Sequence, residues 1–242
     1  MELLALALAP GIAIMWFIYS KDRYEREPLR ALIKSFILGM LCIVPAVLIE
    51  LGGTWLQDRL MPGHGWWYLL VKAFLVVAFT EEACKFLMVK WYAWPRHFFN
   101  EPFDGIVYGV MVAMGFATLE NIGYVMQYGW QTGLLRMFLS VPAHATFGVL
   151  MGYYLGLAKF THDSHSRQLM VRGLLLSVLF HGLFDLFLFA QEDAAITQKW
   201  SSGFLFGTAI LSYFVAVRLS WQAIQMHQEI SRNNFQSKEK TV

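Results

Sequence analysis

Long apolar segments separated by short charged connections are the feature that most limits how this chain can fold. A helix that crosses a lipid bilayer needs roughly 20 mostly apolar residues. Segments of about this length or more lie at 3–19, 33–56, 66–92, 103–127, 135–158, 173–190 and 204–221. Only 15% of the residues are charged, against about 25% in a soluble domain. The sequence therefore predicts an all-α, polytopic integral membrane bundle of about seven transmembrane helices in a lipid bilayer.

The Lys and Arg residues indicate the orientation of this bundle. They concentrate after the first, third and fifth segments and in the C-terminal tail, whereas the connection at 128–134 contains none. Cytoplasmic connections carry the excess of basic residues, so we expect the N-terminus outside and the C-terminus in the cytoplasm. We expect residues 1–230 to form a single transmembrane domain and residues 231–242 a solvated cytoplasmic tail. The basic residues build no groove for a nucleic acid, so no nucleic-acid partner is expected.

Charged and polar residues inside the apolar segments are the second constraint. Each charged group near the bilayer centre costs on the order of 3 kcal/mol to insert. Half a dozen such groups would cost as much as the whole stability of a domain, unless they face one another or a wet cavity. We therefore expect these residues to converge on one site. They are Glu50, Glu81, Glu82, Lys85, Asp104, Glu120, Asn121, His144, His181 and Asp185.

The spacing of these residues supports convergence. Glu81 and Lys85 are four residues apart and share a helix face, as do His181 and Asp185. Lys85 is expected to act as a counter-ion for the glutamates, and Asp185 to orient His181. With the predicted orientation, one pocket that opens towards the outer half of the membrane accommodates them all.

Some of these residues have a simpler structural role. Asp104 stands at the start of its segment, which is typical of a helix N-cap. Glu50 lies five residues before Trp55, so it is expected to reach the membrane interface. His144 taken alone is as typical of a hydrogen-bonded packing residue as of a site. His227 follows the last apolar segment, outside the spans, where a structural role is expected.

A cluster of Glu and His residues in an apolar pocket has a defined chemical capacity. A carboxylate in such a pocket is a stronger base, so it can take a proton from water. A neighbouring histidine can share that proton or stabilise a developing oxyanion. Two His and one or two Glu equally fit a zinc site with an open position. Both routes to amide hydrolysis stay open on the residues alone.

Four blocks, taken in order and spacing, resemble the PrsW family of intramembrane proteases. The first two are Glu-Glu-Ala-Cys-Lys at 81–85 and Phe-Asp-Gly-Ile-Val-Tyr-Gly at 103–109, the second continuing to Glu-Asn at 120–121. The third starts at His144, and the fourth is His-Gly-Leu-Phe-Asp at 181–185. This resemblance implies a protease core at about 66–190 in a bacterial plasma membrane. It also implies cleavage of a membrane-anchored regulator, typically an anti-sigma factor, on the extracytoplasmic side as the first (site-1) cut.

The resemblance also assigns roles, by analogy with the distantly related CAAX prenyl endopeptidases and bacteriocin-processing proteins. One of Glu81 and Glu82 would be the base, assisted by Glu120 or His144. His181 would stabilise the oxyanion while Asp185 positions it. Lys85 and Asn121 are expected to support these groups. The resemblance leaves the cofactor open between no metal and a divalent metal such as zinc, whose candidate ligands are Glu81, Glu82, Glu120, His144 and His181.

Two features depart from the wider superfamily, and three other functions remain as alternatives. Glu120 stands where relatives often have His, and Asp185 where they often have Asn. A non-catalytic membrane protein that binds a partner would keep the polar core for packing. A proton-coupled transporter would use it as a relay, although no internal repeat is visible. A haem protein would use His144 and His181, but carboxylates crowd the same region.

Overall fold

The computed structural model describes residues 2–61, 63–161 and 163–239, and in these ranges it contains helices and connections without any strand. The first helices are α1 (Glu2–Lys21), α2 (Leu29–Leu41), α3 (Ile43–Leu60) and α4 (Trp66–Val71). The π-helical segment η1 (Lys72–Ala78), α5 (Phe79–Met88) and a second π segment, η2 (Val89–Ala93), continue directly from α4. The remaining helices are α6 (Pro102–Tyr128), α7 (Trp130–Phe138), α8 (Ser140–Lys159), α9 (Asp163–Phe189), α10 (Ala194–Thr197) and α11 (Ser202–Glu239).

The described part of the chain has six helical stretches long and apolar enough to cross a membrane. They are Glu2–Lys21, Leu29–Leu60, Pro102–Tyr128, Trp130–Lys159, Ser164–Phe189 and Ser202–Ser237. Each covers one of the predicted segments, except for residue 190 at the end of segment 173–190, which confirms the polytopic helical bundle. The remaining predicted segment, 66–92, is also helical throughout, but it alternates between α and π geometry and contains the charged residues of the first block. The seven-span count and the orientation stay predictions.

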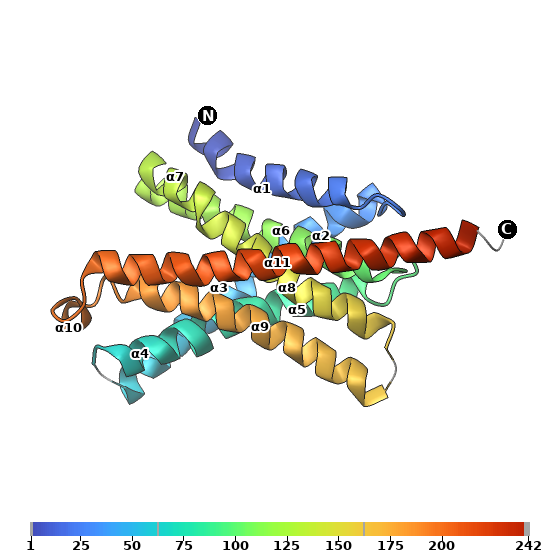
Figure 1. Cartoon of the computed structure of the whole chain (residues 1–242). Coiled ribbons are helices and arrows are strands. Elements are labelled where there is room, and N and C mark those ends of the chain that lie inside the picture. Colours follow the sequence, from blue (N-terminus) through green and yellow to red (C-terminus); the bar gives the residue numbers. More distant parts are fainter. Residues whose placement is uncertain (1, 62, 162, 240–242) are drawn as a thin grey trace.

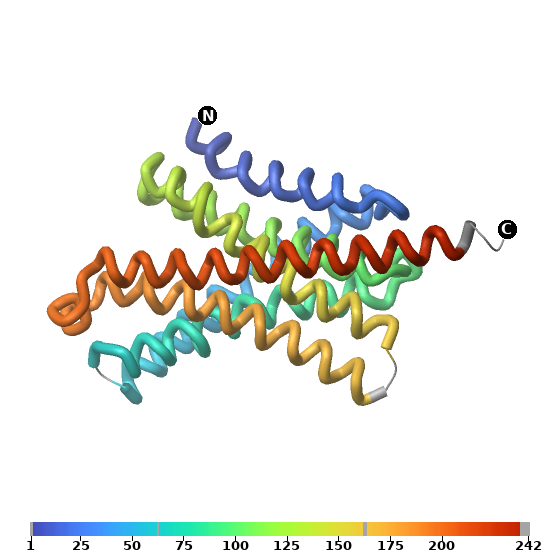
Figure 2. The backbone as a smooth tube through the Cα atoms, in the orientation of Figure 1, coloured from blue at the N-terminus to red at the C-terminus, as the bar shows by residue number. Residues whose placement is uncertain are grey.

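The helices run lengthwise beside one another (Figure 1). The N-terminus, α4 and α10 lie at the left-hand end, and the C-terminal end of α11 lies at the right (Figures 1 and 2). On the predicted orientation, the left-hand end is extracytoplasmic. α11 continues as a helix through the predicted tail to Glu239, whereas residues 240–242 lie outside the described part.

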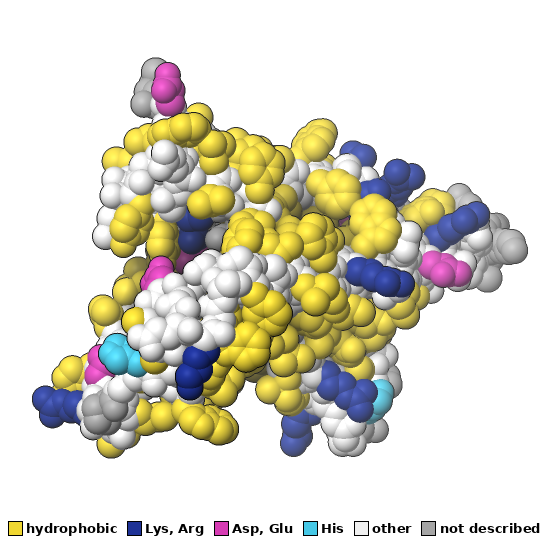
Figure 3. Space-filling model, turned by 60° about the vertical axis from the view of Figure 1, so that its left-hand side comes forward, with side chains coloured by type: hydrophobic (Ala, Val, Ile, Leu, Met, Phe, Trp, Pro, Cys, Tyr) yellow, Lys and Arg dark blue, Asp and Glu magenta, His cyan; other side chains and the backbone are white. Residues whose placement is uncertain are grey.

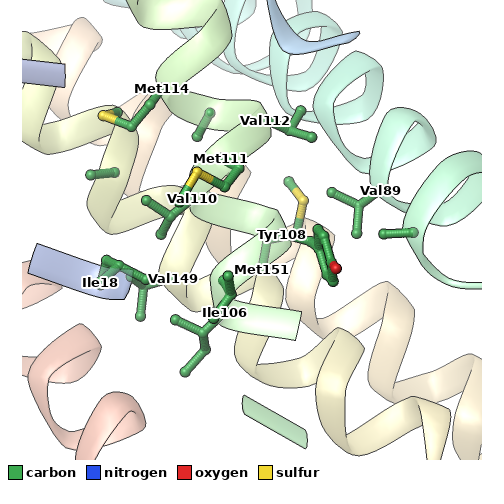
Figure 4. Close-up of a cluster of buried hydrophobic side chains, with 14 of the residues drawn as sticks. Ile18, Val89, Ile106, Tyr108, Val110, Met111, Val112, Met114, Val149 and Met151 are labelled. Atoms are coloured by element: carbon green, nitrogen blue, oxygen red, sulfur yellow. The ribbon is translucent and has the colours of Figure 1, made fainter. Parts of the chain in front are cut away.

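α6 is the central helix, and its side chains are buried without interruption from Pro102 to Thr118. Figure 4 shows its apolar side chains, among them Ile106 and Met114, packed with Met151 of α8, Val89 of η2 and Ile18 of α1. A helix that is apolar on all sides needs neighbours on all sides. α1, α2, α8 and α11 supply them, so α6 fixes the positions of the helices that carry the polar residues.

Glycines let α8 approach the backbone of α6. Gly105 and Gly109 of α6 face Gly148, Gly152 and Gly156 of α8. A Cβ atom added to Gly109 would lie 2.6 Å from the carbonyl oxygen of Gly148, which is closer than real Cβ contacts. In lipid, where apolar burial gives no driving force between helices, such close packing holds them together.

Three of the four glycines at 105, 109, 115 and 123 in α6 allow close packing. Gly115 meets the backbone of α2 at Phe36, where Gly39 makes the reciprocal approach to Val112. Gly123 is the exception, because no atom lies within 4 Å of the position that a Cβ atom would occupy there. Gly123 is near the C-terminal end of α6, beyond the crossings with α2 and α8.

The end of the bundle opposite the N-terminus is tied together by a network of acidic residues. Asp104 accepts hydrogen bonds from the backbone N–H groups of Asn100 (2.7 Å) and Glu101 (2.8 Å). It caps the start of α6 as predicted, but from position N3 of a capping box whose N-cap residue is Glu101. Glu27, in the connection between α1 and α2, accepts a hydrogen bond from the Tyr108 hydroxyl. Burial raises the pKa of Glu27 to about 7. His227, which follows the last predicted segment, is buried in α11 and stacks on Tyr153.

The glycine contacts predict a matched pair of opposite effects. Gly109→Ala forces α6 and α8 apart and should destabilise the protein by about 1–3 kcal/mol, the usual range for overpacking. Gly123→Ala meets no neighbour, so the better helix propensity of Ala should leave the stability unchanged or raised by up to about 1 kcal/mol. Thermal unfolding of the two purified variants in one detergent measures the difference. Equal unfolding temperatures would contradict the proposed α6–α8 packing.

Candidate active site

A cleft of about 720 Å³ opens among α3, η1, α5, α6, α7, α8 and α9. Six of the residues expected to converge line it: Glu50, Glu81, Glu120, His144, His181 and Asp185. Its lining continues past Trp55 and Lys72 to Glu192, so it opens towards the end that carries α4 and α10. Figure 3 brings this end forward, where charged side chains lie in a hollow between apolar flanks. The predicted convergence is therefore confirmed for these residues.

The mouth of the cleft is held by Asp193, which precedes α10. Its carboxylate accepts hydrogen bonds from the backbone N–H groups of Ala195 (2.9 Å) and Ile196 (3.2 Å), and so caps α10. It also accepts from the N–H of Gly65 (2.7 Å), before α4. Burial alone would raise the pKa of Asp193, but the three backbone N–H donors lower it below the usual range. Asp193 thus joins the connections before α4 and before α10.

Lys85 is at the centre of the buried cluster behind the cleft. Its Nζ donates to Glu81 Oε2 at 2.9 Å, to Glu82 Oε1 at 2.7 Å and to His144 Nδ1 at 3.1 Å. It also lies 4.2 Å from the centroid of the Phe116 ring. The Glu82 and Lys85 side chains are 0% and 2% exposed, so neither charge is hydrated from outside. These contacts agree with the expected counter-ion role of Lys85.

His144 connects the Lys85 cluster to Glu120. Its Nδ1 faces Lys85 Nζ. The Lys85 ammonium group can only donate hydrogen bonds, so Nδ1 must accept. Its Nε2 lies 3.0 Å from Glu120 Oε2 and therefore donates to that carboxylate. The two contacts fix the ring orientation and leave the proton on Nε2.

His181 is held between two carboxylates. Its Nδ1 lies 2.9 Å from Glu82 Oε1 and its Nε2 lies 3.2 Å from Asp185 Oδ2. The ring stacks on Phe147 at a centroid distance of 5.0 Å. Asp185 is four residues along α9 from His181, as its expected orienting role requires.

Arg136, which the sequence pattern did not single out, completes the outer side of the site. Arg136 of α7 donates from Nη2 to Glu120 Oε2 at 2.6 Å and from Nε to Asn121 Oδ1 at 3.0 Å. Asn121 in turn donates to the backbone oxygen of Ala7 in α1 at 3.0 Å. Asn121 thus supports the site from behind and does not line the cleft. Arg136 could have been found as the only basic residue within the apolar segment 135–158.

Glu50 of α3 also faces the cleft, and the expectation that it reaches the membrane interface is wrong. Its Oε1 atom is buried and has no hydrogen-bond partner in the described part of the chain. The position of Glu50 inside an apolar segment indicated a place in the site, whereas the nearby Trp55 indicated the membrane interface.

Glu81, Glu82, His144 and His181 could together hold a metal ion, because each offers one ligand atom and these atoms lie within 4.8 Å of one another. Two carboxylates and two imidazoles suit zinc. The acidic groups around this cluster (Glu50, Glu81, Glu82, Glu120 and Asp185) outnumber the basic groups that touch them, Lys85 and Arg136. Glu82 Oε2 is also buried without a hydrogen-bond partner among the described residues. The donor set therefore fits a divalent cation.

Comparison with known proteins shows the family of the chain. A family model described as PrsW family intramembrane metalloprotease matches residues 27–220. The chain belongs to the PrsW family. It is 36% identical over 224 residues to Protease PrsW of Halalkalibacterium halodurans, covering 93% of this chain and 94% of that protein. It is 36% identical over 191 residues to Protease PrsW of Bacillus subtilis, covering 79% of this chain and 84% of that protein.

A third relative, Protease PrsW of Clostridioides difficile, is 35% identical over 201 residues, which cover 81% of this chain and 83% of that protein. No solved structure matches the chain. The resemblance inferred from the four blocks is confirmed, and the chain is a peptidase that spans a bacterial membrane several times. An intramembrane protease of the PrsW family works in lipid on a membrane protein.

The central place of Lys85 predicts a large effect of its removal. Lys85→Met leaves Glu81 and Glu82 buried without their cation, which typically destabilises a protein by about 3–5 kcal/mol. Lys72→Met is the matched control, because Lys72 lines the cleft nearer its mouth and makes a cation–π contact with Phe189. Accumulation in the membrane and thermal unfolding in detergent measure both variants. Normal stability of Lys85→Met would contradict the counter-ion role.

Proposed function

We propose that this PrsW-family protein is an endopeptidase that hydrolyses a peptide bond of a single-pass membrane regulator of the anti-sigma-factor type. The observation that carries the proposal is a cleft, open at one end of the bundle, with Glu81 and His181 in its lining and a buried ion cluster behind them. On the predicted orientation that end is extracytoplasmic. The cut would then fall on the outer side, as the first step in releasing such a regulator.

The geometry favours Glu81 over Glu82 as the base. Glu81 lines the cleft, whereas Glu82 does not, and Glu82 accepts hydrogen bonds from both Lys85 and His181. Adjacent residues on a helix point about 100° apart, so only one of the two is expected to face the water. Glu81 takes a proton from a cleft water as the water oxygen bonds to the substrate carbonyl carbon. The same proton then goes to the amine nitrogen as the C–N bond breaks.

The remaining residues position the catalytic groups and stabilise the charge that develops on the substrate carbonyl. Asp185 orients His181 at Nε2 and Glu82 holds it at Nδ1. By exchanging its contact with Asp185, Nε2 can donate to the developing oxyanion. Arg136 and Glu120 fix the orientation of His144 through Nε2. Lys85 offsets the charges of Glu81 and Glu82. Fixed groups of this kind need no reorganisation during the reaction.

The donor set of Glu81, Glu82, His144 and His181 would hold a metal ion if the enzyme uses one. A bound divalent metal would supply Lewis-acid polarisation of the carbonyl and a more acidic water. Lys85 Nζ hydrogen-bonds three of these four residues, so binding a cation there requires those bonds to be exchanged. Metal content of the purified protein and activity after chelation are therefore direct measurements of metal use.

Substitution of the cleft residues tests the protease proposal. Co-expressed single-pass anti-sigma-type reporters should be cut by the wild type, and Glu81→Gln and His181→Ala should each lower cleavage at least about 100-fold, the usual contribution of acid–base groups. Glu82→Gln should also lower cleavage, because it removes the negative charge that faces both Lys85 and His181. Glu229→Gln, an exposed acidic position on α11, is the matched control.

Matched accumulation of every variant in the membrane is required, and the purified protein is assayed with and without a chelator. Loss of cleavage on chelation, with recovery on adding zinc, assigns the metal route, and unchanged cleavage assigns Glu81-activated water. Equal processing by the wild type and all cleft variants would contradict the proposed site.

A further inference from the structure

α3 is the thin wall between the cleft and the surrounding lipid. Only Ala46 and Gln57 of its side chains are buried, and large apolar residues such as Leu48 (65% exposed) face outwards. Its cleft-facing side is different, because Glu50, Thr54 and Asp58 line the cleft. These three polar residues, here called the α3 row, are each four positions apart and so fall on one helix face.

Nothing in the proposed mechanism uses the α3 row. Glu50 has a buried oxygen without a hydrogen-bond partner in the described ranges. Asp58 Oδ1 accepts from the Tyr68 hydroxyl at 2.6 Å, near the mouth. A buried polar group left without a partner is costly in an apolar wall. Its presence therefore calls for a ligand that donates hydrogen bonds.

An intramembrane protease has to bind its substrate in an extended form. The backbone N–H groups of a transmembrane helix are satisfied within the helix, and unwinding it in an apolar setting exposes them at a cost of several kcal/mol each. A wall of hydrogen-bond acceptors beside the catalytic residues lowers this cost. Four helical residues rise about 6 Å, and two extended residues span about 6.6 Å, so acceptors on the α3 row match alternate residues of an extended chain.

We propose that the α3 row, with Glu50 as its innermost member, binds the unwound segment of the substrate through backbone N–H groups. This inference rests on the proposed protease function and deepens it, because it identifies the wall that holds the substrate across from Glu81. Recognition through the backbone favours substrates whose helix unwinds easily at the bound segment. Such recognition depends little on which side chains the segment carries. Glu50 is thus a positioning residue for substrate, and Glu81 remains the base.

The test measures cleavage of a fluorogenic peptide that covers the cut segment of a reporter that the wild type processes, in detergent. Glu50→Leu should raise KM about tenfold with little change in kcat. Glu50→Gln keeps an acceptor oxygen and should recover most of that loss. Ile49→Ala is the matched control, since Ile49 is 54% exposed and does not line the cleft. Unfolding temperatures of all three variants report whether each remains folded.

Peptides that carry a single backbone N-methyl group give the second readout. At the position that faces Glu50, N-methylation should raise KM for the wild type and should add little for Glu50→Leu, because both changes remove one hydrogen bond. A folded Glu50→Leu variant with wild-type KM, or with a lower kcat and unchanged KM, would overturn the inference. A wild-type protein that cleaves neither reporter nor peptide would instead contradict the protease function.

Discussion

The ion cluster around Lys85 is the interaction on which the rest of the structure depends. Glu81 and Glu82 are buried within an apolar bundle, and the ammonium group between them compensates charges that would otherwise be costly to insert. The same contacts extend to His144 on α8 and, through Glu82, to His181 on α9. The buried charges of α5 are therefore tied directly to both histidines of the site.

Close helix packing places the partners of this cluster. Because Gly109 and Gly148 allow α6 and α8 to touch backbone to backbone, Glu120 on α6 reaches His144 on α8. Arg136 on α7 then joins Glu120 from the outer side. The first block lies in α5, which follows the π segment η1 in one continuous run, and single π-turns within helices often accompany functional sites. Packing and charge compensation together leave Glu81 on the cleft side of the cluster.

The sequence was sufficient where one physical rule dominated. Apolar length predicted the bundle, and the cost of buried charge predicted that Glu81, His144 and His181 would meet. It was insufficient where the outcome depended on tertiary geometry. The rotation of α3 decides that Glu50 faces the cleft, and the crossing positions of α6 decide that Gly123 packs against nothing. Arg136 was not predicted as a site residue, because a basic residue near the end of an apolar segment is typical of the membrane interface.

The most direct test of the central claim is a structure of the Glu81→Gln variant trapped with its membrane-anchored substrate. The proposed site predicts an extended substrate segment in the cleft, with the scissile carbonyl carbon close to residue 81 and His181 on the side of the carbonyl oxygen. Glu82 and Lys85 should remain buried behind residue 81 and His181, without contact to the substrate. A substrate bound outside the cleft, or one whose scissile bond lies away from residue 81, would contradict the assignment.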